Sequence, residues 1–193
     1  LLLILKYITM PSLQKAICSL EIDRRGFKSL IGAETPHPRE TIEKNLKKPQ
    51  ADRLWHIADG FRHQMTIDEI HQLTQIDPWF LHQIKEIIDF ESFILKEKQL
   101  LPETLKKAKE FGFSDFRLSE LLNLGGIKST ETDIRNLRRK HNITPTFKKV
   151  DTCSAEFEAY TPYYYSCYDE EDEILSSPPS HAKKKIMILG GGP

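Results

Sequence analysis

The sequence predicts a mainly α-helical bundle with short strands at its flanks. Two patterns point to this fold class: apolar residues recur every three or four positions through the middle of the chain, and no strand-like alternation occurs between residues 40 and 142. The chain has 193 residues, of which 39% are hydrophobic, so it can form a packed core without disulfides or metals. We therefore expect a bundle of about six or seven helices.

The first 22 residues contain one predicted helix, from Thr9 to Glu21. Thr9 is a suitable N-cap, and Pro11 is tolerated in a first turn. The apolar run Leu1–Leu5 is too short to span a membrane and no signal-cleavage pattern follows it, so we interpret it as the end of a core strand. Because the chain begins with Leu, we expect it to be a piece of a longer protein. Glycines and prolines make residues 23–40 a loop.

From residue 41 onward, start and stop signals separate the predicted helices. Thr66 and Glu69 have the spacing of a capping box, and Asp77 followed by Pro78 is a typical helix start. The helix after Asp77 has no breaker before Lys98 and should be roughly 30 Å long. A stripe at helical spacing runs along it and consists of Phe80, Leu81, Ile84, Ile87, Ile88, Glu91 and Leu95. The other predicted helices cover residues 41–48, 51–63, 66–73, 102–111, 115–122 and 130–141.

Neither the cysteines nor the histidines form a metal-binding pattern. The histidines of the central helices, His56, His63, His71 and His82, do not form the arrangement that places two imidazoles and a carboxylate together. The cysteines are far apart and form no CxxC pair, which favours free thiols in a reducing cytoplasm; they are Cys18, Cys153 and Cys167. We predict no metal site and a cytoplasmic protein.

Charge is distributed unevenly near the end of the chain, although 28 basic and 28 acidic residues give a formal net charge of zero. Residues 135–150 hold six basic residues and no acidic one, whereas residues 151–182 hold eight acidic residues and no Lys or Arg. This pairing favours an internal or interdomain contact. Five of the six tyrosines follow Glu158, and the run Tyr163–Tyr168 has β propensity.

One alternative reading of the chain is a nucleic-acid-binding module. Residues 115–122, the glycine pair 125–126 and residues 130–141 resemble a helix-turn-helix in outline, and the second helix carries arginines that could meet phosphates. These arginines are Arg135, Arg138 and Arg139. Zero net charge and the adjacent acidic segment argue against this alternative. We expect neither a nucleic acid nor a membrane as partner.

The chain ends with a predicted buried strand, Lys185–Leu189, followed by glycines. Glycines after a strand allow backbone amides to approach a phosphate, so Gly190, Gly191 and Gly192 are candidate cofactor-binding residues. The helix that would complete such a site does not follow within the 193 residues. We therefore interpret this segment as the start of a neighbouring nucleotide-binding domain.

Four stretches of the chain resemble, in order and spacing, the large chain of carbamoyl-phosphate synthetase. The most specific of them runs from Val150 to Phe157 and continues through Thr161 to Tyr168. The other three are Ser12–Ala16 with Leu20–Glu21, Ala51–Arg62 continuing to Leu81, and Lys185–Pro193. The resemblance places the chain on the helical oligomerisation domain between two ATP-grasp halves.

The resemblance also implies a division of the chain into segments and a function. Residues 1–22 would end the first ATP-grasp half, 23–40 form a loop, 41–158 the oligomerisation domain, 159–184 a Tyr-rich acidic linker, and 185–193 the first strand of the second half. The family makes carbamoyl phosphate from bicarbonate, ATP and ammonia supplied by a glutaminase subunit, for arginine and pyrimidine synthesis. ATP and Mg²⁺ or Mn²⁺ bind in the halves, so no catalytic residue is carried over to this chain.

The resemblance implies that the helical domain meets other large chains through an apolar helical face. We expect this face to lie on the helices that begin near residues 41 and 51. The candidate interface residues are Ile42, Leu46, Trp55 and Phe61. By itself the segment is expected to be a catalytically silent spacer.

Overall fold

The computed structural model describes residues 2–20, 22, 24, 26–32, 34–153, 156–157, 160 and 163–174. The chain divides into two compact units, a helical unit spanning Leu1–Thr144 and a hairpin unit spanning Pro145–Pro193. Within the described residues, eight helices lie in the helical unit and two short strands in the hairpin unit. The predicted mainly α-helical fold is confirmed, and so is the absence of strands between residues 40 and 142.

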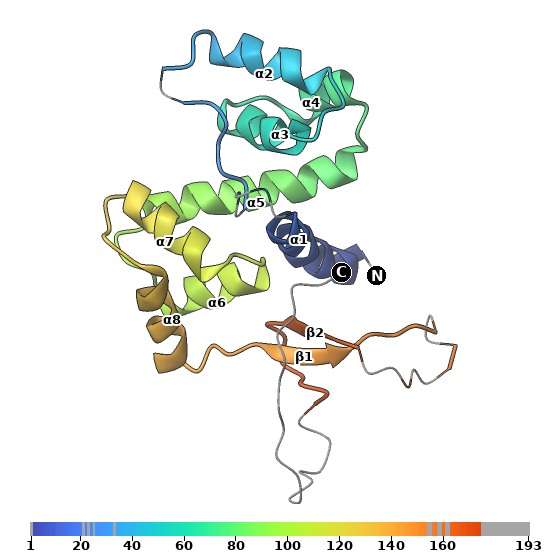
Figure 1. Ribbon diagram of the computed structural model, residues 1–193, viewed down its shortest axis with the longest axis vertical. Helices are drawn as coiled ribbons and strands as arrows, with labels where there is room; N and C mark the ends of the chain where they lie inside the picture. The colour runs from blue at the N-terminus through green and yellow to red at the C-terminus, as the bar shows by residue number, and fades with distance from the viewer. Residues whose placement is uncertain are drawn as a thin grey trace, which may run out of the picture. The chain divides into compact units, whose positions relative to one another are not determined.

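The helical unit is organised around its longest helix, α5 (Figure 1). Helix α5 contacts α1, α3, α4 and α7, while α2 packs on α3 and α4, and α8 packs on α6 and α7. The helices are α1 (Leu2–Ser19), α2 (Pro38–Leu46), α3 (Arg53–Arg62), α4 (Ile67–Thr74), α5 (Pro78–Lys96), α6 (Pro102–Glu110), α7 (Asp115–Leu124) and α8 (Glu131–Lys140). Helix α5 therefore joins the α2–α4 group to the α6–α8 group.

Several of the helices begin at a side-chain cap. The predicted capping box is present at α4, where Glu69 N donates to the Thr66 hydroxyl and Thr66 N donates to the Glu69 carboxylate. At α5 the Asp77 carboxylate accepts a hydrogen bond of 2.8 Å from Trp79 N. Thr130 and Asp133 form a second capping box at α8. Each cap satisfies backbone donors that a helix leaves unpaired at its first turn.

One cluster of buried apolar side chains, drawn from all eight helices, forms the core of the helical unit. Its largest fully buried members are Trp55, Phe27 and Phe113. Phe27 is notable because it comes from the loop before α2 and not from a helix. The loop is therefore part of the packed unit, although its backbone is irregular.

The start of the chain differs from the prediction. Residues Leu2 to Ser19 form one helix with Pro11 inside it, so the predicted strand at Leu1–Leu5 and the helix start at Thr9 are wrong. Leucine is a strong helix former, and a short apolar run cannot be assigned to strand or buried helix from its pattern. The buried face of α1 carries Met10 and Ile17, whereas Leu20, beyond the helix end, is 52% exposed.

The described part of the hairpin unit is built on two antiparallel strands, β1 (Thr146–Lys149) and β2 (Tyr164–Cys167). Thr146 pairs with Cys167, and Lys149 pairs with Tyr164. The tyrosine run thus forms a strand, as its β propensity predicts. The predicted strand Lys185–Leu189 and the glycines after it lie outside the described residues. Among the helices that are described, none has the length and apolar character needed to cross a membrane.

Candidate functional site

Two arginines and two carboxylates from three helices form a buried ionic group, which we call the α3–α5–α7 charge cluster. Glu91 of α5 accepts from both arginines, at 2.6 Å from Arg62 Nη2 through Oε2 and at 2.9 Å from Arg117 Nε through Oε1. Arg62 Nη1 also donates to Asp59 Oδ1 at 2.9 Å. The side chains of Glu91 and Arg117 are only 3% and 5% exposed. Each buried charge in the cluster thus has an opposite charge beside it, which offsets part of its desolvation cost.

The same cluster holds the loop before α2. Arg62 and Arg117 both donate hydrogen bonds to the carbonyl oxygen of Phe27. The second carboxylate oxygen of Asp59 accepts a 2.8 Å hydrogen bond from Leu30 N. These bonds replace the helical partners that the loop backbone lacks, so the loop is fixed to α3 and α7 at two points.

A second ionic group, the α6–α7–α8 charge cluster, links the last three helices. Asp115, the first residue of α7, accepts from Lys109 Nζ at 2.9 Å and from Arg138 Nη2 at 2.6 Å. Arg138 Nε donates to the same carboxylate, so the arginine binds it with two nitrogens. Lys109 also donates to the carbonyl of Phe113. Bidentate pairing of this kind fixes the orientation of α8 against α7.

Burial and pairing shift the pKa values in this second cluster. Burial lowers the pKa of Lys109, although the hydrogen bond to Asp115 acts in the opposite direction. Burial also tends to raise the pKa of Asp115, but the hydrogen bonds from Arg138 and Lys109 outweigh it and hold that pKa below its ordinary value. The carboxylate is therefore stabilised as an anion by the two cations around it.

Helix α1 docks on the turn between α6 and α7 by a close backbone approach. Gly112 has a φ of +89°, and a Cβ placed on it would lie 2.6 Å from Pro11 Cα. The buried amide of Gln14 donates a 3.0 Å hydrogen bond to the carbonyl of Phe111. Only glycine allows both this turn and this contact. Helix α1 is thus held in register with the turn.

The four predicted interface residues lie in the core of the helical unit. Ile42 and Leu46 of α2 are fully buried, and Trp55 and Phe61 of α3 are 1% and 6% exposed. The indole nitrogen of Trp55 donates a 3.0 Å hydrogen bond to the carbonyl of Gly26. In this chain the four side chains therefore pack against their own unit, and their contact with a second chain stays a prediction.

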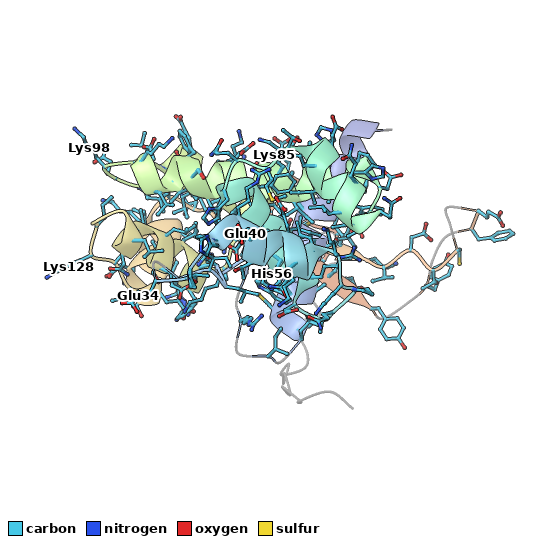
Figure 2. The ribbon with its side chains drawn as sticks, turned by 90° about the horizontal axis from the view of Figure 1, so that it is seen from above. Glu34, Glu40, His56, Lys85, Lys98 and Lys128 are labelled. Carbon is cyan, nitrogen blue, oxygen red and sulfur yellow. The ribbon has the colours of Figure 1, made fainter. Side chains whose placement is uncertain are left out.

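The outer surface of α2 is charged. Arg39 Nε lies 3.1 Å from Glu43 Oε1, and its Nη2 pairs with Glu69 of α4. Figure 2, which looks at the helical unit from the α2 side, labels Glu40 on this surface. Lys44 is exposed one turn further along the helix. An interface formed on this side would therefore contact charged groups first.

Two of the three arginines of the helix-turn-helix alternative are engaged within the protein. Arg138 binds Asp115, and Arg135 Nη2 lies 2.8 Å from Glu131 on its own helix. Arg139 is exposed. Because Arg135 and Arg138 are paired with carboxylates, the helix offers few free charges to phosphates, and the structure does not support the nucleic-acid alternative.

The candidate chemistry of the other predicted residues is limited. In the ranges that the structure describes, no three His, Cys, Asp or Glu side chains come together to hold a metal ion. His56 is buried, with Nε2 3.7 Å from Asp52. The thiols of Cys18, Cys153 and Cys167 are all free. The three glycines Gly190, Gly191 and Gly192 lie outside the described residues.

The two charge clusters are the functional feature that the sequence reasoning missed. One signal was visible: Glu91 occupies a position in the apolar stripe of the long helix, where a charge needs a partner. Its partners Arg62 and Arg117 are 29 and 26 residues away in the sequence, so no local pattern could identify them. Because the clusters pair acids with bases, they are suited to fixing helices and not to acid–base chemistry.

Comparison with known proteins gives a consistent assignment. The family described as "Carbamoyl-phosphate synthetase large chain, oligomerisation domain" matches residues 9–142. The carbamoyl phosphate synthase large chain of Methanothermobacter thermautotrophicus is 47% identical over 182 residues, which are 94% of this chain and 16% of the relative. The large chain of Vibrio cholerae is 44% identical over 184 residues, with the same two shares.

A third relative carries a more specific name. The "Carbamoyl phosphate synthase large chain, N-terminal section" of Aquifex aeolicus is 45% identical over 160 residues, which are 82% of this chain and 27% of the relative. The chain thus spans only a small part of the curated relatives it matches. The family match falls within the helical unit, from α1 to the residues just after α8.

Proposed function

Because this chain belongs to the carbamoyl-phosphate synthetase large-chain family, in the region of the oligomerisation domain, we propose that it is the helical spacer and oligomerisation domain of such a large chain. The observation that carries the proposal is the coincidence of the family match, residues 9–142, with a helical unit spanning Leu1–Thr144. The charge clusters and the docking of α1 support a spacer, because they fix the helices at several points.

The protein that contains this segment is proposed to make carbamoyl phosphate from bicarbonate, ATP and ammonia derived from glutamine, for arginine and pyrimidine synthesis. Its flanking ATP-grasp halves would bind ATP with Mg²⁺ or Mn²⁺, and a glutaminase small subunit would supply ammonia. Residues 185–193 would begin the second half. The names of the relatives support this activity.

Self-association with other large chains is proposed to occur on the layer formed by α2 and α3. The four predicted interface residues are buried, so they would support the two helices from the core side without contacting the second chain; they are Ile42, Leu46, Trp55 and Phe61. The exposed residues of α2, including Glu40 and Lys44, would make the contact. Electrostatic matching of such residues sets the partner and the register of an interface.

Sedimentation velocity of the 193-residue chain over a range of concentrations tests this proposal. The chain should self-associate, and exchanging the charges of α2 by Glu40→Lys with Lys44→Glu should weaken association by about tenfold or more. The matched control is Lys85→Glu with Asp89→Lys on α5, which exchanges a surface pair of 2.6 Å (Lys85 is labelled in Figure 2). A strictly monomeric chain at high concentration would contradict the oligomerisation role. Equal weakening by both exchanges would contradict the α2–α3 assignment.

Catalytic silence of the segment is tested separately. The purified 193-residue chain should show no bicarbonate-dependent ATP hydrolysis with Mg²⁺ present, because the ATP-grasp halves are proposed to lie outside it. The complete large chain assayed under the same conditions is the positive control. If the 193-residue chain hydrolysed ATP and kept this activity after repurification, the spacer assignment would be wrong.

A further inference from the structure

The hairpin unit exposes aromatic side chains on both faces of its sheet. Cross-strand pairing places Phe147 and Tyr164 on one face and Tyr165 on the other. These side chains are 38%, 47% and 46% exposed, respectively. A two-stranded hairpin is marginally stable in water unless one face packs against another element. Strands of four residues each with aromatic groups in solvent on both faces therefore need a partner surface.

The exposed aromatic groups continue beyond the strands. Tyr163, which precedes β2, is 65% exposed, and Phe157 and Tyr160 are 76% and 83% exposed. We call the six residues Phe147, Phe157, Tyr160, Tyr163, Tyr164 and Tyr165 the aromatic surface. Aromatic side chains are enriched at protein interfaces. Phe147 and the consecutive Tyr163, Tyr164 and Tyr165 bring four such exposed groups to one hairpin, because Tyr163 O accepts a backbone hydrogen bond from Val150 next to β1.

The charge of this region indicates the kind of partner that it fits. Residues 145–174 contain eight acidic and two basic residues. Lys148 is already engaged, with its Nζ 2.8 Å from Asp169 and 3.9 Å from Glu171. Two copies of such an acidic surface would repel each other. The partner should therefore be apolar at its centre and basic at its rim, which argues against a second hairpin unit.

We propose that the aromatic surface is the docking site for the second ATP-grasp half of the same large chain. This inference rests on the proposed function, since it needs a large chain in which that half follows. Residues 168–184 connect β2 with the predicted first strand of that half and reach at most roughly 60 Å when extended. A tether of this length gives the neighbouring domain a high effective concentration at the hairpin. The hairpin is thus the element that joins the spacer to the half that follows it.

Hydrogen exchange of the hairpin amides tests the proposal in the complete large chain and in the 193-residue chain. Protection of residues 146–149 and 164–167 should be at least about tenfold higher in the complete chain, since docking adds to local stability. Phe147→Ser with Tyr165→Ser should remove this difference. The matched control is Phe93→Ser on α5, because Phe93 is as exposed as Tyr165, at 46%. This substitution should leave the difference in protection between the two chains unchanged. Equal protection in the two chains would overturn the proposal.

Two further measurements separate docking from loss of the hairpin fold and from self-association. Tyr163→Ser lies outside both strands and should lower the protection in the complete chain while leaving that of the 193-residue chain unchanged. Sedimentation of the Phe147→Ser, Tyr165→Ser chain should match the unsubstituted chain. If this variant loses self-association and the protection difference persists, the surface binds a second copy and the proposal is wrong. A monomeric chain with an intact protection difference would contradict only the oligomerisation role.

Discussion

The helical unit and the hairpin unit contain ion pairs of similar length that stand in different surroundings. Glu91 and Arg117 meet at 2.9 Å with side chains 3% and 5% exposed, whereas Lys148 and Asp169 meet at 2.8 Å with side chains 19% and 57% exposed. A buried charge that loses its partner keeps its desolvation cost, but an exposed one is simply solvated. Distance alone therefore does not tell which pair the fold depends on.

The comparison extends to what each unit requires from outside. The helical unit closes a core around α5 and saturates its buried charges within itself. The hairpin unit, in its described residues, has its ladder and surface pairs but exposes its aromatic side chains. The first is built as a self-sufficient body and the second as a contact element, which is how a spacer and its connection to another domain would differ.

Removing the central carboxylate of the α3–α5–α7 charge cluster should have the largest effect. Glu91→Ala leaves the buried Arg117 and the half-buried Arg62 with one carboxylate fewer, and we expect the free energy of unfolding to fall by about 3–5 kcal/mol. Urea denaturation followed by circular dichroism measures the change. The control is Glu43→Ala, which removes an exposed pair with Arg39 and should cost about 0.3–0.5 kcal/mol. If the two variants lowered the free energy of unfolding equally, the burial of an ion pair would not decide how much the fold depends on it.

The docking of α1 on the helical unit should be the next most sensitive feature. Gly112→Ala adds a Cβ 2.6 Å from Pro11 Cα at a φ of +89°, so strain and overpacking together should cost about 2–4 kcal/mol. Gly126→Ala is a matched control, because its φ is +87° and its Cβ would meet nothing within 4 Å. This control should cost only about 1–2 kcal/mol. Thermal unfolding that gave the same loss for both would show that α1 is not held at this turn.

Local signals made most of the helical fold predictable. The Asp77 cap and the Thr66–Glu69 capping box depend on residues a few positions apart, so the helix starts at α5 and α4 could be placed from sequence. The start of α1 could not, because Leu1–Leu5 is compatible with either a strand or a buried helix. The start of a helix is thus easier to predict from sequence where a capping residue marks it than where the helix begins in an apolar run.

The arrangement of charges and contacts was less predictable. Arg138 was expected to face the acidic segment after residue 150, or a phosphate, but it binds Asp115 at the start of the preceding helix. Helix packing decides this pairing, and nothing in the local sequence specifies it. Ile42 and Trp55 show the same limit, since apolar residues at helical spacing occupy cores and interfaces alike.

The α6–α7–α8 charge cluster should make the stability of the helical unit fall in acid. The folded pKa of Asp115 is lower than its ordinary value of 3.8, so its contribution to unfolding free energy is complete above that value and is lost as pH falls through the folded pKa. Asp115→Asn should cost about 1–3 kcal/mol at pH 7, because it leaves Lys109 and Arg138 without their carboxylate. The difference between variant and unsubstituted chain should shrink as pH falls below 3.8.

Salt distinguishes this buried cluster from the surface pair of the hairpin unit. The pKa of Asp169 is also lowered, chiefly by its hydrogen bond from Lys148, but the carboxylate is largely exposed. In urea titrations, Asp115→Asn should therefore lower the free energy of unfolding by nearly the same amount at low and at high salt. The loss of hairpin amide protection that hydrogen exchange detects for Asp169→Asn should instead disappear at high salt. A cost of Asp115→Asn that disappeared in salt would place Asp115 with the surface pairs.

The smallest effect is expected from the hairpin lysine itself. Lys148→Gln removes the pair with Asp169, and hydrogen exchange of the strand amides should show a loss of about 0–1 kcal/mol. The matched control is Lys149→Gln. The ammonium of Lys149 lies 5.9 Å from the centroid of the Tyr160 ring. If the hairpin needs a partner surface more than it needs its own ion pairs, neither substitution should approach the cost of Glu91→Ala. A loss of several kcal/mol from Lys148→Gln would mean that the hairpin is held by its charges, and the contrast between the two units would fail.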